Sequence, residues 1–247
     1  MIQDLHSHTY YSFCGADRPE DVVERAIDGG IELFGICDHN YGIGFGRHDV
    51  FSSSASDLRA DYGRNLRRYF DHINLIKEKY ADKIKILRGI EIATVSGARY
   101  ALPDAVDVSF FDYCLIEHID NDTSVSRGDL FSFAKRCACP VGVAHTDLFA
   151  HAEKMGIEPL EYFKRMADEN IFWEMNVSYD SIHKFREHSY MLRFFENEAE
   201  QDIVRRSGVK LSVGFDGHRC NEYRADRVSD YCRRIEKMCI PMAFEDI

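Results

Sequence analysis

The stretch Asp4-Leu5-His6-Ser7-His8-Thr9 ends the first predicted strand, which begins at Ile2. Residues two apart on a strand point to the same face, so the imidazoles of His6 and His8 can reach a single ion. In parallel α/β folds the loops that follow the strands converge at one end of the sheet, where functional sites are built. This segment therefore predicts the first part of a site at that end.

The rest of the chain alternates between strand-like and helix-like segments. Further strands are predicted over 33–37, 84–92, 113–118, 141–145, 171–177 and 209–215, helices over 18–28, 57–80, 127–137, 159–169, 190–207 and 222–239, and a loop over 40–56. Such alternation indicates an α/β fold of parallel strands joined by right-handed crossovers. Periodicity alone leaves open whether the seven strands close into a barrel or form an open sheet.

Composition narrows the class of protein. The chain has 247 residues, and 31 Lys and Arg against 42 Asp and Glu give a net charge of −11. A hydrophobic content of 45% is enough for a buried core, and the absence of linker-like segments predicts one domain over residues 1–247. The sequence has no apolar run of the ~20 residues needed to span a bilayer, which argues against a membrane-spanning protein. Without a signal-like start we expect a cytoplasmic protein, and the acidic balance makes nucleic acid an unlikely partner.

Residues that bind metals recur at the ends of the other predicted strands. They are Asp38-His39, Gly89-Ile90-Glu91, Glu117-His118, Ala144-His145-Thr146-Asp147, Glu174 with Asn176, and Asp216-Gly217-His218. Imidazole and carboxylate together suit Zn, Mn or Fe, and a shared carboxylate can bridge two ions. A single strand-end histidine is more often only hydrogen-bonded, but burying this many polar groups without a metal would be costly. We therefore predict a multi-metal centre and interpret the remaining histidines as ordinary: His48, His72, His151, His183 and His188.

Together these motifs resemble the PHP (polymerase and histidinol phosphatase) superfamily. The resemblance runs from Asp4 to about Asp226 and rests on Asp4–Thr9, Cys37-Asp38-His39, Arg88-Gly89-Ile90-Glu91, His118, Val143-Ala144-His145-Thr146-Asp147 and Gly214-Phe215-Asp216-Gly217-His218. It implies a distorted (β/α)7 TIM-like barrel with two or three divalent ions at the carboxyl ends of the strands. The ligands implied are His6, His8, Glu91 and Asp216 for one ion, Glu91, His118 and His145 for a second, and His39 and His218 for a third.

One position departs from that family. PHP proteins often have a histidine eight residues after the first histidine of the His-x-His pair, as a ligand of the third ion, and here the residue is Cys14. A thiolate is a good ligand for zinc and a poor one for manganese. Asp17 could instead supply the ligand, or the third ion could be weakly bound or absent.

The resemblance implies metal-assisted hydrolysis of a small phosphomonoester, and the spacing is most similar to histidinol-phosphatase-type members. His39, Glu91 and His218 are the candidate catalytic residues, with Asp147 as a further proton-transfer candidate, and Arg219 and Arg47 are candidates to bind the phosphate. Glu174 and Asn176 are expected to support ligands. Three alternatives are an amidohydrolase-type metal hydrolase, a phosphodiesterase or exonuclease on the same scaffold, and a metal-binding module without catalysis. Amidohydrolase-type enzymes usually bridge their metals with a carboxylated lysine from a middle strand, whereas the third predicted strand of this chain carries Glu91.

Overall fold

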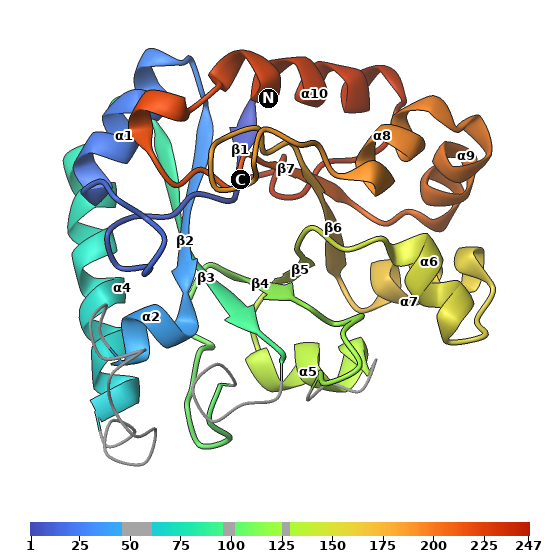
Figure 1. Cartoon of the computed structure of the whole chain (residues 1–247), viewed down its shortest axis with the longest axis horizontal. Coiled ribbons are helices and arrows are strands. Elements are labelled where there is room, and N and C mark those ends of the chain that lie inside the picture. Colours follow the sequence, from blue (N-terminus) through green and yellow to red (C-terminus); the bar gives the residue numbers. More distant parts are fainter. Residues whose placement is uncertain (46–60, 96–101, 125–128) are drawn as a thin grey trace.

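The computed structural model describes residues 1–45, 61–95, 102–124 and 129–247. Within those ranges seven strands form one sheet, in which each strand pairs in parallel with the next along the chain (Figure 1). The strands are β1 (Gln3–Asp4), β2 (Leu33–His39), β3 (Lys85–Ala93), β4 (Tyr113–Glu117), β5 (Val141–Val143), β6 (Ile171–Asn176) and β7 (Leu211–Gly214). All seven lie within a residue or two of the predicted strands.

The sheet curls until its last strand returns to its first. The amide of Leu5, just after β1, donates a hydrogen bond of 2.9 Å to the carbonyl of Val213 on β7. Ser7 and Gly217 then form a parallel bridge beyond the two strands. The nearly closed barrel confirms the predicted (β/α)7 fold, and it settles the choice between barrel and open sheet that periodicity left open.

Helices surround the strands (Figure 1). They are α1 (Pro19–Asp28), α2 (Asn40–Phe45), α4 (Tyr62–Lys79), α5 (Leu130–Cys137), α6 (Leu148–Lys154), α7 (Pro159–Asp168), α8 (Ser189–Glu196), α9 (Glu198–Ser207) and α10 (Ala225–Lys237), with a short 3-10 turn at Cys220–Glu222. None of the helices in the described ranges is both long enough and apolar enough to cross a bilayer.

The observed helices differ from the predicted elements in three places. The segment predicted as a loop over 40–56 begins with α2, and its residues 46–56 lie outside the described part of the chain. The helix predicted over 190–207 is two helices, because the extended backbone of Asn197 ends α8 and its side chain caps α9 by accepting from the amides of Ala199 and Glu200. Helix α6 was not predicted, since its seven residues are too short to show a clear period.

Tyr113 fills the inside of the barrel. Its hydroxyl donates to the carbonyl of Leu5, and its ring lies against the backbones of β2 and β3. A Cβ on Gly35 would lie 2.1 Å from the Tyr113 hydroxyl oxygen, and a Cβ on Gly89 would lie 2.4 Å from the ring. Only glycine at these two positions leaves room for the ring, which closes the interior below the site.

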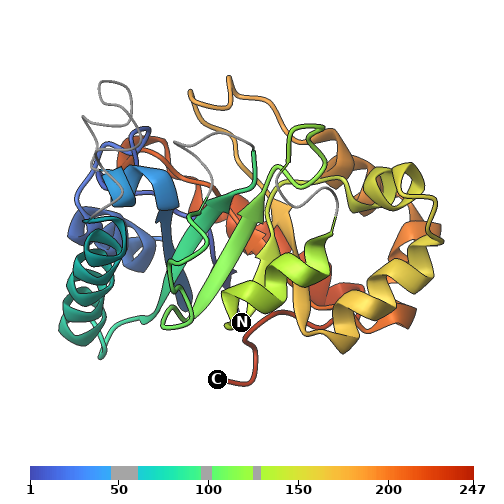
Figure 2. The same ribbon diagram turned by 90° about the horizontal axis from the view of Figure 1, so that it is seen from below.

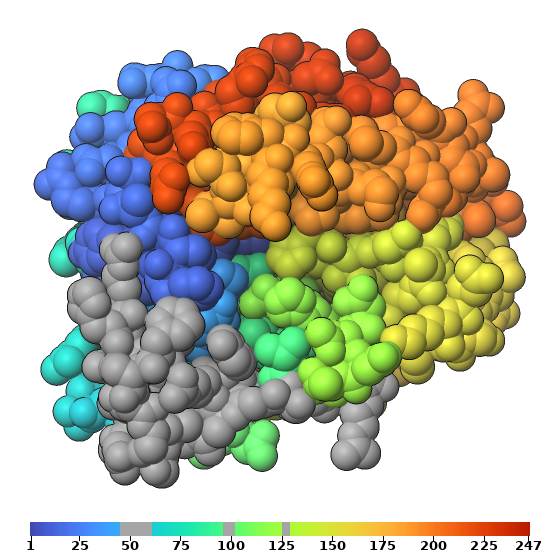
Figure 3. Space-filling model, in the orientation of Figure 1, coloured from blue at the N-terminus to red at the C-terminus, as the bar shows by residue number. Residues whose placement is uncertain are grey.

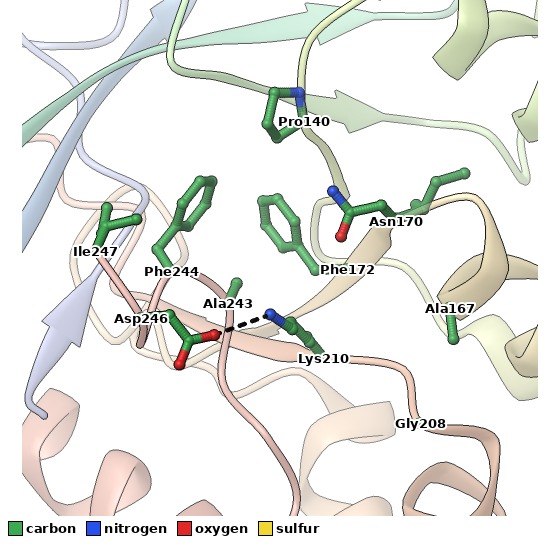
Figure 4. Close-up of a pocket in the computed structure, with 11 residues that line it drawn as sticks. Pro140, Ala167, Asn170, Phe172, Gly208, Lys210, Ala243, Phe244, Asp246 and Ile247 are labelled. Atoms are coloured by element: carbon green, nitrogen blue, oxygen red, sulfur yellow. Dashed lines mark ion pairs between the residues drawn. The ribbon is translucent and has the colours of Figure 1, made fainter.

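The last residues of the chain cross the amino-terminal end of the barrel. The Ala243 amide donates to the Leu211 carbonyl at 2.8 Å, and the Gln3 side chain donates to the Ala243 carbonyl at 2.8 Å. Figure 4 shows the hollow of about 200 Å³ at this end, where Phe244 lies near Phe172. In Figure 2 both termini lie at this end, opposite the orange segment that follows β6. The other end of the barrel is left free for a site.

Candidate metal centre

The carboxylate of Glu91, near the end of β3, lies at the centre of a group of imidazoles. Its oxygens are 2.8 Å from Nδ1 of His39, 3.1 Å from Nε2 of His145, 3.3 Å from Nε2 of His6 and 3.5 Å from Nε2 of His8. These histidines come from the ends of three strands, β1 (His6 and His8), β2 (His39) and β5 (His145), and Glu91 is 1% exposed. One buried carboxylate thus faces four ring nitrogens from three separate parts of the chain.

Asp216, which follows β7, is a second centre beside the first. Its Oδ1 lies 3.0 Å from Nε2 of His8, 3.6 Å from Nε2 of His6 and 3.7 Å from Nε2 of His218. Its Oδ2 lies 3.0 Å from Nε2 of His183. Because His6 and His8 face both Glu91 and Asp216, the two carboxylates share one site.

Three of these strand-end residues have a left-handed backbone. The φ angles are 62° for His118, 26° for His145 and 56° for Asp216. Non-glycine residues adopt this conformation at a cost of about 1–3 kcal/mol each, and such residues concentrate at functional sites. The Asp216 amide donates to the His6 carbonyl at 2.7 Å, and the His145 amide donates to Glu174 at 2.9 Å. These bonds hold the backbones of Asp216 and His145 in place, with Asp216 facing His8 and His145 facing Glu91.

Glu174 and Asn176 on β6 support these groups from below, as the sequence led us to expect. Glu174 Oε1 lies 2.7 Å from Nδ1 of His6, which leaves Nε2 of His6 facing Glu91. The Asn176 side chain donates to both Glu174 and Asp216, each at 3.2 Å. A Cβ on Gly214 would lie 2.1 Å from a Glu174 oxygen, so this glycine makes the packing possible. A carboxylate on the far nitrogen of a histidine is the usual way of fixing a metal-binding tautomer.

The segment after β6 brings further groups that the sequence analysis missed. Asp180 lies 2.7 Å from Nδ1 of His183 and 3.3 Å from Nδ1 of His218. The ring of His188 stacks on that of His145 with centroids 6.0 Å apart. His183, interpreted from the sequence as ordinary, thus lies beside Asp180 and Asp216, and His188 lies beside His145. The available signal was the Asp-x-x-His spacing of Asp180 and His183, which lies a few residues beyond the end of β6.

Glu117, the last residue of β4, is a further carboxylate of the site. It lies 3.4 Å from Nδ1 of His39, 3.9 Å from Nε2 of His145 and 2.9 Å from Nε2 of His118. His118 is half exposed and its ring centroid is 5.9 Å from that of His145. Glu117 was predicted at this strand end, but only its neighbour His118 was predicted as a ligand.

Cys14 lies among the histidines. Its Sγ and ring nitrogens of His8 and His39 are all within 4.8 Å of one another. Burial would raise the pKa of the thiol, but His8, His218 and His39 outweigh it and lower the pKa to about 6. The alternative residue, Asp17, instead accepts a hydrogen bond of 2.7 Å from the Cys220 amide.

Of the other polar candidates, Asp147 and Arg219 lie outside this cluster. Asp147 caps α6 through the Ala150 amide and pairs with Arg193 at 2.7 Å. Arg219 is exposed beside His218 and donates to the Ser181 hydroxyl at 3.0 Å. Arg47 lies outside the described residues. The side chain of Asp147 is therefore bonded to groups outside the cluster, and Arg219 lies at the rim of the site.

The acidic and basic side chains of the cluster stabilise one another's charged forms, but some of their polar atoms have no hydrogen bond. Burial lowers the pKa of His6, but Glu174, Asp216 and Glu91 outweigh it and raise the pKa well above its usual value. Burial raises the pKa of Glu91, but His6 and His39 outweigh it and lower the pKa well below its usual value. Even so, His6 Nε2, His39 Nδ1 and Glu91 Oε2 are buried without a well-formed hydrogen bond to any described residue.

Unbonded nitrogen and oxygen donors that face one another are what a divalent cation requires. Four groups of three donors, each with its atoms within 4.8 Å, fit an ion: His6, His8 and Asp216; His39, Glu91 and Glu117; His8, Cys14 and His39; and Asp180, His183 and His218. Mixed imidazole and carboxylate sets suit Zn, Mn or Fe, and the set with the thiol favours Zn. The residues present therefore fit a metal centre.

Figure 3 looks onto this face of the molecule, where the orange segment after β6 borders the blue segment of the first residues. Ring contacts join the two, since the His8 and His218 centroids are 4.6 Å apart and those of His183 and His218 are 5.3 Å apart. The β6–α8 segment thus forms one wall of the site.

Comparison with known proteins adds independent findings. The family model described as the PHP domain matches residues 4–241. A histidinol-phosphatase of Lactococcus lactis subsp. lactis (strain IL1403) is 29% identical over 133 residues, which cover 53% of this chain and 45% of that protein. The matched region is therefore less than half of the relative.

Two solved structures are similar in fold. A histidinol phosphate phosphatase from Lactococcus lactis subsp. lactis Il1403, complexed with Zn, L-histidinol and phosphate, has a TM-score of 0.58 at 17% identity, over 98% of this chain and 95% of that one. A histidinol phosphatase described as putative, from Listeria monocytogenes, has a TM-score of 0.50 at 15% identity, over 89% of this chain and 96% of that one. At these identities the likeness concerns the fold alone.

Proposed function

Because this chain belongs to the PHP domain family, we propose that it is a metal-dependent phosphatase that hydrolyses a small phosphomonoester. The observation that carries the proposal is the carboxylate of Glu91, buried and facing four imidazole nitrogens at 2.8–3.5 Å. Such a group is costly without a cation and well suited to bridge two. We place it at the middle of a centre of two or three divalent ions.

The proposed ligands are the sets that the family resemblance implied, with Cys14 kept for the third ion and Glu117 added because it lies beside His39, His118 and His145. His6, His8, Glu91 and Asp216 would hold one ion, and Glu91 would bridge to a second with His145, His118 and Glu117. His39, Cys14 and His218 would hold a third. Bound divalent cations would make water a better nucleophile near neutral pH and offset the charge of the phosphate.

Residues of the chain would orient the reaction around that centre. Asp180 on Nδ1 of His218 leaves Nε2 directed at Asp216, and the rings of Phe13 and Tyr41 stack on His39 at 5.6 and 4.9 Å. His39 and His218 would thus be held in place beside the reacting phosphate. With the third ion absent they are the candidates for moving a proton to the leaving alcohol, and with it bound they would be its ligands. Arg219, at the rim next to His218, would contact the phosphate oxygens.

Histidinol phosphate is the substrate we propose first, because a histidinol-phosphatase is among the relatives. The test is a phosphate-release screen with and without added Zn or Mn, over histidinol phosphate, nucleotides, sugar phosphates and a phosphodiester control. We expect release from phosphomonoesters only with metal, and the highest kcat/KM for histidinol phosphate. Release from other monoesters alone would reject that substrate and keep the phosphatase. Preferential cleavage of the diester would reject the phosphatase.

The role of Cys14 has a separate test. With its pKa lowered to about 6, the thiol is mostly thiolate at pH 7, so iodoacetamide should alkylate Cys14 of metal-free protein readily. Zinc should slow this alkylation about tenfold or more if the sulfur is a ligand, since coordination occupies the nucleophile. Cys239, which is exposed, serves as the internal control and should react equally with and without zinc. Equal rates at Cys14 would remove it from the ligand set.

A further inference from the structure

Three cysteines meet at the opposite end of the barrel from the metal centre. Cys114 is the second residue of β4, Cys137 is the last residue of α5, and Cys139 lies just before β5. The sulfurs of Cys114 and Cys139 are 3.3 Å apart. Two sulfur atoms that merely pack against each other lie farther apart than this. The distance exceeds the length of a disulfide bond by only about 1.3 Å.

The backbone fixes this approach. The Cys114 amide donates a hydrogen bond of 2.9 Å to the carbonyl of Pro140, and Cys114 pairs in register with Val141 on β5. Ala138, with φ 53°, reverses the chain after α5 and carries Cys139 toward β4. A covalent bond between Cys114 and Cys139 would therefore link two segments that the sheet already holds side by side.

Access to the pair is one-sided. Cys139 is partly exposed and lines a hollow of about 270 Å³ together with Lys135, Glu169 and Asn170. Cys114 is fully buried. This hollow shares Pro140 and Asn170 with the hollow at the amino-terminal end of the barrel (Figure 4). A small oxidant can thus reach Cys139 from solvent. The sulfur of Cys114 can react only with groups inside the protein, such as Cys139.

We propose that Cys114 and Cys139 are a redox-active pair that a hydroperoxide converts into an intramolecular disulfide. In the first step the Cys139 sulfur attacks the peroxide, the O–O bond breaks, and Cys139 becomes a sulfenic acid as hydrogen peroxide is reduced to water. In the second step the Cys114 sulfur attacks the Cys139 sulfur and releases a second water. The two thiols are oxidised by two electrons, and one peroxide is reduced to two waters.

The bond would act on a part of the barrel that carries the site. It would close the segment between the two cysteines, and that segment includes the carboxyl end of β4 with Glu117 and His118. The proposal does not depend on the proposed phosphatase activity, because it concerns thiols at the other end of the strands. It makes this end of the barrel a modification site.

Peptide mapping of the zinc-loaded protein after hydrogen peroxide treatment tests the proposal, since zinc itself is redox-inactive. Free thiols are blocked before digestion, and the yield of linked peptides containing Cys114 is measured with and without dithiothreitol. We expect a dithiothreitol-sensitive link in the wild type and in Cys137→Ser, which keeps both partners. In Cys139→Ser the link should fall at least tenfold.

Three outcomes would overturn the proposal. They are an unlinked wild type, a Cys139 that proceeds to sulfinic acid in place of the link, and a Cys139→Ser variant that forms the link as well as the wild type. The last would assign Cys137 as the partner of Cys114. Thermal melting of each variant beside the wild type establishes that a lost link does not reflect lost folding.

Discussion

Replacing Glu91 with glutamine should abolish metal-dependent phosphate release and lower the metal content of the protein. The amide keeps the size of the side chain but loses the charge that faces His6, His8, His39 and His145. Changing a residue that merely supports a ligand costs roughly 10–100-fold in metal affinity or activity. A bridging ligand should therefore cost more, so we expect hydrolysis of p-nitrophenyl phosphate below about one hundredth of wild type.

The matched control is Glu236→Gln, which makes the same chemical change on the exposed side of α10. It should leave both activity and metal content unchanged. Metal analysis and p-nitrophenyl phosphate hydrolysis are measured on the same preparations of all three proteins. A Glu91→Gln variant with full activity and undiminished metal would refute the bridging role.

Removing the metal should also lower the stability of the wild-type protein. A ligand that binds only the folded state at 100 times its Kd stabilises it by about 2.7 kcal/mol. For a chain of this length each kcal/mol shifts Tm by roughly 2–4 °C, so chelation should lower Tm by about 5–10 °C. Thermal melts of chelator-treated protein, titrated back with zinc, measure this shift.

The Glu91→Gln variant separates specific from general effects of the cation. It should show a smaller zinc-dependent rise in Tm than the wild type, because it lacks the central carboxylate. A wild-type Tm that zinc does not change would argue against a metal centre. An equal rise in both proteins would show that zinc acts elsewhere on the chain.

The fold was predictable because its signal is local and repeated. Most of the strands are buried along their length and are mostly apolar in sequence, as in Leu33–His39 and Ile171–Asn176. Barrel closure depends on contacts between the two ends of the sheet, such as the bond from Leu5 to Val213, which no local period encodes. Short elements such as α6 have too few residues to show a period, so they were missed.

The site residues that could be predicted from the sequence are those at the ends of strands. His6, Glu91 and Asp216 are brought together because parallel strands deliver their carboxyl ends to one face. Asp180 and His183 arrive on a connection whose path depends on tertiary contacts, and a loop sequence carries no periodic signal of that path. The same limit applies to Arg219, whose position at the rim follows from the loop after β7.

Anomalous diffraction at the zinc edge, from crystals grown with zinc, tests the central claim most directly. We expect at least two peaks in the mouth of the barrel, one within bonding distance of His6, His8 and Asp216, and one sharing Glu91 with it. Zinc absent from the mouth, with these side chains ordered and bonded only to one another, would contradict it.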